Sequence, residues 1–183
     1  RSEENACLEF ECSGFSKEIA GNSRKRDVFS IFSQNIRSLS KNFEKLYDVV
    51  QDINKCSKDK FLFTAIAVQE TFQVRQIFQI PGYQKFVSKT RARGNGGGVG
   101  FFIREGCDFE ILDEPSFFEA RVHESLFIRV VGNNDRGIII GNVYRPNTAP
   151  YASVSKSTEY LSKSLDYIKR RHRNDSIIIV GDL

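Results

Sequence analysis

Apolar residues along the chain fall into two patterns: short continuous runs, and longer stretches in which they recur every three or four positions. The short runs are rich in Val, Ile, Leu and Phe, which is typical of β-strands. They cover residues 28–34, 61–68, 84–88, 99–103, 126–131, 138–144 and 177–180. Gly, Asn and Asp between residues 131 and 138 are turn-forming and predict a hairpin. The last run is apolar throughout and predicts a buried strand.

Two stretches show the spacing of one helical face instead. In the first, Ser40 is placed to cap the start of the helix. The apolar faces comprise Phe43, Leu46, Tyr47, Val50 and Ile53 in the first helix and Val154, Leu161, Leu165 and Ile168 in the second. Many strands with only two long helices predict an α/β fold in which one sheet packs on another and the helices lie outside. A single doubly wound sheet fits this pattern less well.

Length and composition are those of an ordinary globular domain, with 183 residues of which 40% are hydrophobic and 27% charged. Residues 1–27 show little apolar periodicity, so we expect a flexible tail or linker there and the domain itself at 28–183. The net charge of +4 permits a polyanionic partner without requiring one. No apolar run approaches the roughly 20 residues of a membrane span, and we expect no membrane partner. Four scattered cysteines and two histidines form no zinc motif and no disulfide framework.

Four of the apolar runs end in polar residues. These are Asn35, Glu70, Asp182 and the segment Tyr144-Arg145-Pro146-Asn147. One polar residue at a strand end usually only meets solvent. Four together indicate a site, because ligands of α/β folds bind at strand ends. Carboxylates suit a hard cation such as Mg²⁺, and amide, phenol and guanidinium groups donate to phosphate. This set indicates phosphoryl transfer and not acyl transfer, since no Ser or Cys has a matched His partner.

Five short motifs occur in an order that makes a resemblance specific. They are Ser33-Gln34-Asn35-Ile36-Arg37-Ser38-Leu39, Val68-Gln69-Glu70-Thr71, Gly96-Gly97-Gly98-Val99-Gly100, Asn142-Val143-Tyr144-Arg145-Pro146-Asn147 and Val180-Gly181-Asp182-Leu183. In order and rough spacing the chain from residue 28 to residue 183 resembles the endonuclease/exonuclease/phosphatase superfamily. The Asn-Ile-x-Ser-Leu and Tyr-Arg-Pro details look like the endonuclease domain of non-LTR (LINE-type) retrotransposons, whose reverse transcriptase lies on the same polypeptide.

The resemblance implies an α/β sandwich of two packed mixed sheets, a Mg²⁺ or Mn²⁺ cofactor and a DNA substrate. The DNA substrate in turn implies a nuclear location, with the cytoplasm as the alternative. Glu70 would be the principal metal ligand, with Asn35 beside it. Tyr144 would hydrogen-bond the scissile phosphate, Arg145 and Asn147 would contact substrate, and Asp182 would orient or deprotonate the attacking water.

The sequence also departs from the family pattern. The family continues its Gly-Asp-x motif with an Asn and ends in Ser-Asp-His, and neither feature occurs here. His123 and His172 come too early in the chain to replace that final His, and we expect solvated or capping roles for both. We therefore expect a C-terminally truncated domain that is inactive alone. Two alternatives stay open: a phosphatase or lipid phosphodiesterase of the same superfamily, and a non-catalytic retroelement remnant.

Two further features have mainly structural interpretations. The glycine-rich segment 94–100 lacks both nucleotide-binding fingerprints, so we expect a turn that leads into a strand. The basic residues before it, among them Lys89 and Arg91, could contact a DNA backbone or only solvent. The basic run 169–173 complements the dipole at the end of the second helix, and a nucleic-acid patch there is the minor alternative.

Overall fold

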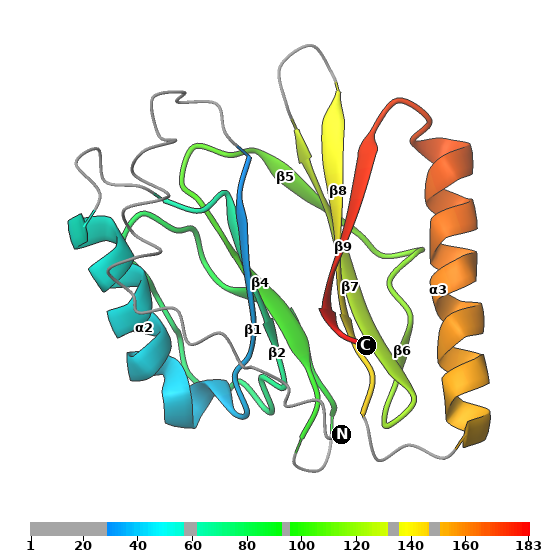
Figure 1. Cartoon of the computed structure of the whole chain (residues 1–183), viewed down its shortest axis with the longest axis horizontal. Coiled ribbons are helices and arrows are strands. Elements are labelled where there is room, and N and C mark those ends of the chain that lie inside the picture. The colour runs from blue at the N-terminus through cyan, green and yellow to red at the C-terminus, as the bar shows by residue number, and fades with distance from the viewer. Residues whose placement is uncertain (1–28, 57–61, 93–95, 132–135, 147–150) are drawn as a thin grey trace, which may run out of the picture.

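The computed structural model describes residues 29–56, 62–92, 96–131, 136–146 and 151–183. Two β-sheets lie face to face, with helix α2 (Leu39–Cys56) on the outer side of one and helix α3 (Tyr151–Arg171) on the outer side of the other (Figure 1). Both sheets contain parallel and antiparallel strand pairs. The predicted class, an α/β sandwich of two packed mixed sheets flanked by helices, is confirmed. The expected tail at 1–27 and Asn147 lie outside the described residues.

The first sheet has four strands in the order β1-β2-β4-β3. These are β1 (Ile31–Asn35), β2 (Ala65–Gln69), β4 (Val99–Ile103) and β3 (Val87–Lys89). Strands β1 and β2 are parallel, with Asn35 opposite Gln69, and β4 runs antiparallel to both β2 and β3. The parallel pair means that β1 and β2 end at the same edge of the sheet.

The second sheet has five strands, with β5-β7-β8-β9 in order and the short β6 paired to β7. Their bounds are β5 (Phe109–Leu112), β6 (Phe118–Glu119), β7 (His123–Val131), β8 (Gly137–Tyr144) and β9 (Ser176–Asp182). The predicted hairpin is the antiparallel pair β7–β8. Helix α3 connects β8 to the parallel strand β9, so Tyr144 and Asp182 meet at the ends of these two strands.

Alternation along the strands divides the core into three layers, because neighbouring side chains of a strand point to opposite faces. Ala65 and Ala67 face the second sheet, while Ile66 and Val68 face α2. In the second sheet Ile128 and Ile140 face the first sheet, and Phe127, Ile139 and Val143 face α3. Several phenylalanine rings fill the layer under α2, where the centroids of Phe43 and Phe78 lie 4.9 Å apart. The two sheets and the two helices therefore form one continuous packed body.

Two expectations about the elements are corrected by the structure, and two short strands were not predicted. Ser40 does not cap the first helix, which begins at Leu39. The carbonyl of Ser38 accepts hydrogen bonds from Lys41 and Asn42 (3.2 and 3.1 Å) and holds that position instead. Strand β9 is only half-buried, because it lies at the edge of the sheet formed by the described residues. The short strands β5 and β6 escaped prediction because neither has an extended apolar run.

Within the described ranges no helix is long and apolar enough to cross a membrane. The basic residues Lys169, Arg170 and Arg171 lie in the last turn of α3, where positive charge complements the helix dipole.

Candidate active site

Strand ends from both sheets converge on Asn35. Its amide nitrogen Nδ2 donates to Glu70 Oε1 and to Asp182 Oδ2, both at 2.8 Å. Its oxygen Oδ1 accepts from the backbone N–H of Arg37 at 3.2 Å. One amide group therefore holds two carboxylates that are far apart in the sequence. The predicted meeting of Asn35, Glu70 and Asp182 is confirmed as geometry, while their catalytic roles stay predictions.

Tyr144 belongs to the same cluster. Its ring is buried at the end of β8, and its hydroxyl hydrogen-bonds the Glu70 carboxylate. Burial raises the pKa of Tyr144 well above its usual value, and the charge of Glu70 and the bond to it act in the same direction. Arg91 acts in the opposite direction. At neutral pH the phenol is protonated and can donate one hydrogen bond.

The backbone around Glu70 has an unusual conformation. Glu70 and Phe72 have φ of 53° and 59°, and Arg37 and Ser38 in the neighbouring loop have φ of 46° and 87°. Non-glycine residues rarely adopt this left-handed region, and when they cluster the surroundings must hold them there. The two loops hold each other, since Ser38 N donates to Glu70 O (2.7 Å) and Leu39 N donates to Thr71 O (3.0 Å).

The position of Asp182 depends on the glycine before it. Gly181 has φ of 138°, and a Cβ built there would lie 1.8 Å from the carbonyl oxygen of Val143. Only glycine allows β9 to come this close to β8 at its end. The backbone of Arg145 then donates to Asp182 O at 2.8 Å, which fixes Asp182 beside Tyr144.

A buried polar bridge under the site joins the two sheets. Gln69 Nε2 donates to Asn142 Oδ1 at 2.7 Å, and Asn142 Nδ2 donates to the carbonyls of Val68 and Gly100 at 3.0 and 2.9 Å. Gln69 also reaches Ser33 Oγ on β1 at 3.2 Å. These bonds fix β2, which Glu70 directly follows, relative to β8, which ends at Tyr144.

A second buried polar group was not predicted as a site residue. Glu124, opposite Tyr144 in the β7–β8 pair, is fully buried and forms an ion pair with Arg91. Arg91 Nε donates to Glu124 Oε1 at 2.6 Å. The signals in the sequence were a carboxylate inside a strand and an unexplained glycine run, and neither sufficed without the fold.

The remaining expectations have mixed outcomes. Arg145 directly follows Tyr144 at the site edge and is half-buried, whereas Asn147 lies outside the described residues. The solvated or capping role expected for His123 is wrong, because its ring is fully buried beside Ser157. His172 directly follows α3, its backbone N–H donates to the carbonyl of Ile168 at 2.7 Å as any helical residue would, and its ring Nδ1 lies 3.4 Å from Asp175 Oδ2. Of the basic residues before the glycines, Lys89 and Arg91 bind Ser116 O and Glu124 instead of facing solvent.

The donor set is compatible with one hard cation. Within the described residues no group of three or more His, Cys, Asp or Glu side chains could hold a metal ion. The carboxylate oxygens of Glu70 and Asp182 meet at Asn35 Nδ2, while Asn35 Oδ1 accepts from the N–H of Arg37. Mg²⁺ commonly takes one or two carboxylates and completes its shell with water and phosphate, so this carboxylate pair fits Mg²⁺ or Mn²⁺. The direct ligand role expected for Asn35 stays a prediction, because its amide presents N–H groups to the carboxylates.

Comparisons with known proteins give structural likenesses only. No protein-family model matches the chain, and no curated protein matches its sequence. Among solved structures, the human Nocturnin catalytic domain with bound sulfate anion aligns with 84% of this chain at 11% identity and a TM-score of 0.49. The Xenopus laevis APE2 catalytic domain aligns with 84% at 15% identity and a TM-score of 0.42.

The chain spans 63% and 58% of the lengths of these two structures. Both TM-scores lie below 0.5, so the fold class rests on the sheets and helices described above and not on these likenesses.

Proposed function

We propose that this chain forms a divalent-metal-dependent phosphodiesterase domain of the endonuclease/exonuclease/phosphatase superfamily. Within the superfamily we propose the endonuclease that nicks target DNA for a non-LTR retrotransposon. The observation that carries the proposal is the convergence of Asn35, Glu70, Tyr144 and Asp182 from four strand ends. Together these groups suit metal-assisted hydrolysis of a phosphodiester.

Each residue has a role that follows from its chemistry. Glu70 and Asn35 would hold Mg²⁺ or Mn²⁺, which when bound polarises a phosphoryl oxygen and makes water more acidic. The Tyr144 phenol is protonated at neutral pH, so its O–H can donate to a phosphate oxygen in place of Glu70. Asp182, exposed at the end of β9, can orient a water molecule and accept its proton.

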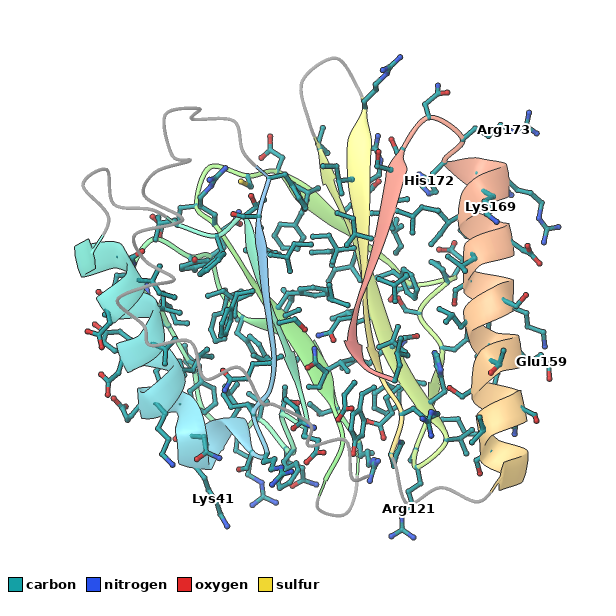
Figure 2. The ribbon with its side chains drawn as sticks, viewed as in Figure 1. Lys41, Arg121, Glu159, Lys169, His172 and Arg173 are labelled. Atoms are coloured by element: carbon teal, nitrogen blue, oxygen red, sulfur yellow. The ribbon has the colours of Figure 1, made fainter. Side chains whose placement is uncertain are left out.

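A basic surface beside the cluster favours a polyanionic substrate. Arg37 and Lys41 follow β1 and are exposed, Arg121 is exposed just before β7, and Arg145 directly follows β8 and is half-buried. Figure 2 shows Lys41 and Arg121 at one end of the molecule and Lys169, His172 and Arg173 at the other. Cations around a phosphodiester site neutralise backbone phosphates. We further propose a DNA substrate, a reverse transcriptase on the same polypeptide and a nuclear location.

Relaxation of supercoiled plasmid by the complete gene product with Mg²⁺ tests this function. We expect nicking that falls roughly 10²- to 10³-fold in Glu70→Gln and in Asp182→Asn, since each removes a charge aimed at the reaction. Glu159→Gln is the matched control, because Glu159 is an exposed carboxylate on α3 that pairs with Lys163. Its activity should equal that of the wild type.

Three results would contradict the proposal. Nicking that persists in Glu70→Gln would exclude this site. A complete product that binds DNA without nicking would favour the retroelement remnant. Hydrolysis of phospholipid headgroups or phosphomonoesters in preference to plasmid would favour the phosphatase or lipid phosphodiesterase.

A further inference from the structure

The Glu124 carboxylate is the most deeply buried charge near the candidate active site. Its side chain has 0% exposure and that of Arg91 has 11%. Oε1 accepts from Arg91 Nε at 2.6 Å and Oε2 accepts from the backbone N–H of Gly98 at 2.5 Å. A buried charge persists only when it is paired and hydrogen-bonded, and here both oxygens are used. The proposed chemistry has no direct use for this pair.

The glycine-rich segment explains what the pair does. Gly97 and Gly98 have φ of 68° and 89°, and a Cβ on Gly97 would lie 2.4 and 2.5 Å from the two oxygens of Glu124 and 2.6 Å from Arg91 Cζ. Only bare backbone can therefore cover the ion pair. The glycines that failed as a nucleotide-binding motif instead cover a buried Glu–Arg pair.

The same segment holds the loop of Glu70 from its other side. Thr71 N donates to Gly98 O at 3.2 Å, and Phe72 N donates to Gly97 O at 2.8 Å. Glu70 and Phe72 are in the left-handed conformation that needs external support. A continuous chain of contacts thus runs from Glu124 on β7, through Gly97 and Gly98, to the peptides directly after Glu70.

We propose that Glu124 and Arg91 form a positioning pair, which fixes the Gly96–Gly98 backbone and through it the Glu70 loop. The pair contacts neither the substrate nor the metal. It acts from the second sheet on a residue of the first sheet, so it sets Glu70 relative to Tyr144, the neighbour of Glu124 across the β7–β8 pair. The inference rests on the proposed function for its catalytic consequence but not for its structural one.

Glu124→Gln tests the pair, because it keeps the size of the side chain and an acceptor for Gly98 N but removes the charge that holds Arg91. We expect hydrogen exchange of the Thr71 and Phe72 amides to accelerate at least roughly 10-fold, as local opening becomes easier. In the nicking assay we expect kcat to fall by up to about 10²-fold with KM nearly unchanged, since small misplacements of reacting groups cost this much.

Asp175→Asn is the matched control. Asp175 is a second buried carboxylate, and it binds an arginine and a glycine N–H in the same way: Arg129 Nε at 2.5 Å and Gly137 N at 2.7 Å. It lies at the opposite end of β8, roughly 23 Å from Tyr144 at the usual rise per strand residue. Asp175→Asn should lower the melting temperature, leave kcat unchanged and leave the exchange of the Thr71 and Phe72 amides unchanged.

A second pair of variants covers the case in which Glu124→Gln folds poorly. Gly97→Ala and Gly96→Ala both place a side chain at a positive φ, but only the Cβ on Gly97 would clash with the ion pair. A Cβ on Gly96 would meet Arg91 Nη1 at 3.6 Å, an ordinary contact distance. We expect Gly97→Ala to reproduce the kcat and exchange effects and Gly96→Ala to show much smaller ones.

The readouts separate the inference from the proposed function. Unchanged exchange of the Thr71 and Phe72 amides in Glu124→Gln, or equal acceleration in Asp175→Asn, would overturn the positioning pair. Accelerated exchange with unchanged kcat per folded molecule would overturn its catalytic part. If the wild type shows no metal-dependent nicking, the proposed function fails, and the exchange experiment still decides whether the pair holds the Glu70 loop.

Discussion

At the scale of single residues, His123 shows how burial decides a titration. The ring is fully buried at the start of β7, with Nδ1 2.9 Å from Ser157 Oγ. Within the described part of the chain Nε2 has no hydrogen-bond partner. Burial lowers the pKa of His123 from 6.5 to about 4, because the charged ring would lose its hydration. The folded protein therefore keeps this histidine neutral at physiological pH.

The first prediction concerns acid stability. The unfolded chain binds a proton at His123 near pH 6.5 and the folded chain only near pH 4, so the free energy of unfolding falls as pH drops between these values. At pH 5.0 the loss from this residue is about 2 kcal/mol relative to pH 7.5. Urea unfolding at both pH values should show that loss in the wild type. His123→Asn, which cannot titrate but can still bond Ser157, should lack this component, and an equal loss in both proteins would refute the assignment.

The four site residues could be predicted because each one ends an apolar run, a local signal. Glu124 and Asn142 could not, because their partners Arg91 and Gln69 lie 33 and 73 residues away. A polar residue inside an apolar run shows that something unusual is buried there. Which group satisfies it depends on how the strands pack, and the run does not contain that information.

At the scale of secondary-structure elements, the two sheets are held in register by more than apolar packing. The Gln69–Asn142 bridge supplies directional bonds between β2 and β8 in an otherwise apolar layer. Nondirectional contacts alone would tolerate a small slide of one sheet over the other, which would separate Glu70 from Tyr144.

The second prediction is a double-mutant cycle on this bridge. Asn142→Leu removes the buried partner of the Gln69 amide and one hydrogen bond from each of two backbone carbonyls, and we expect about 2 to 4 kcal/mol of destabilisation. Gln69→Leu should cost about 2 kcal/mol. The double variant should cost clearly less than the sum, because Leu on both sides leaves no orphaned amide at the contact. Denaturant unfolding of the four proteins measures this, and strict additivity would show that the two side chains do not depend on each other.

The elements themselves were largely predictable from apolar spacing, and their places in the sheets were not. Strand β9 was expected to be buried because Ile177–Val180 is as apolar as the central strand β2. It lies at a sheet edge because its backbone pairs with β8 on one side within the described residues. An apolar run tells a strand from a helix, but long-range pairing decides which strand is central.

At the scale of the whole molecule, the layering followed from element counts, since many strands and two long helices can bury their apolar faces only as sheets between helices. The functional consequence is that the two ends of the molecule differ. Strands β1, β2, β8 and β9 all end at one edge, while the basic end of α3 lies at the other (Figure 2). The two basic regions are therefore distinct: Lys41 and Arg121 lie at the end of the candidate active site, and the basic run 169–173 lies at the end of α3 (Figure 2).

The third prediction locates the cation at one of these two ends. Mn²⁺ added to the protein should broaden NMR signals of residues at the end where Asn35, Glu70 and Asp182 meet. Signals of Gly137 and Asp175 should stay sharp, because they lie roughly 23 Å away along β8. Binding should be weak, since Mn²⁺ and Mg²⁺ would find one or two carboxylates and an amide and keep several waters.

Glu70→Gln should lower the affinity for Mn²⁺ about 10-fold or more, because it removes the charge of the expected ligand while leaving Tyr144 and the fold in place. Lys163→Gln frees the carboxylate of Glu159 on the exposed face of α3 and controls for nonspecific binding to any unpaired carboxylate. It should add no broadening near α3 at the concentrations that broaden Asn35. Broadening centred on α3, or unchanged in Glu70→Gln, would mean that the converging strand ends do not hold the ion.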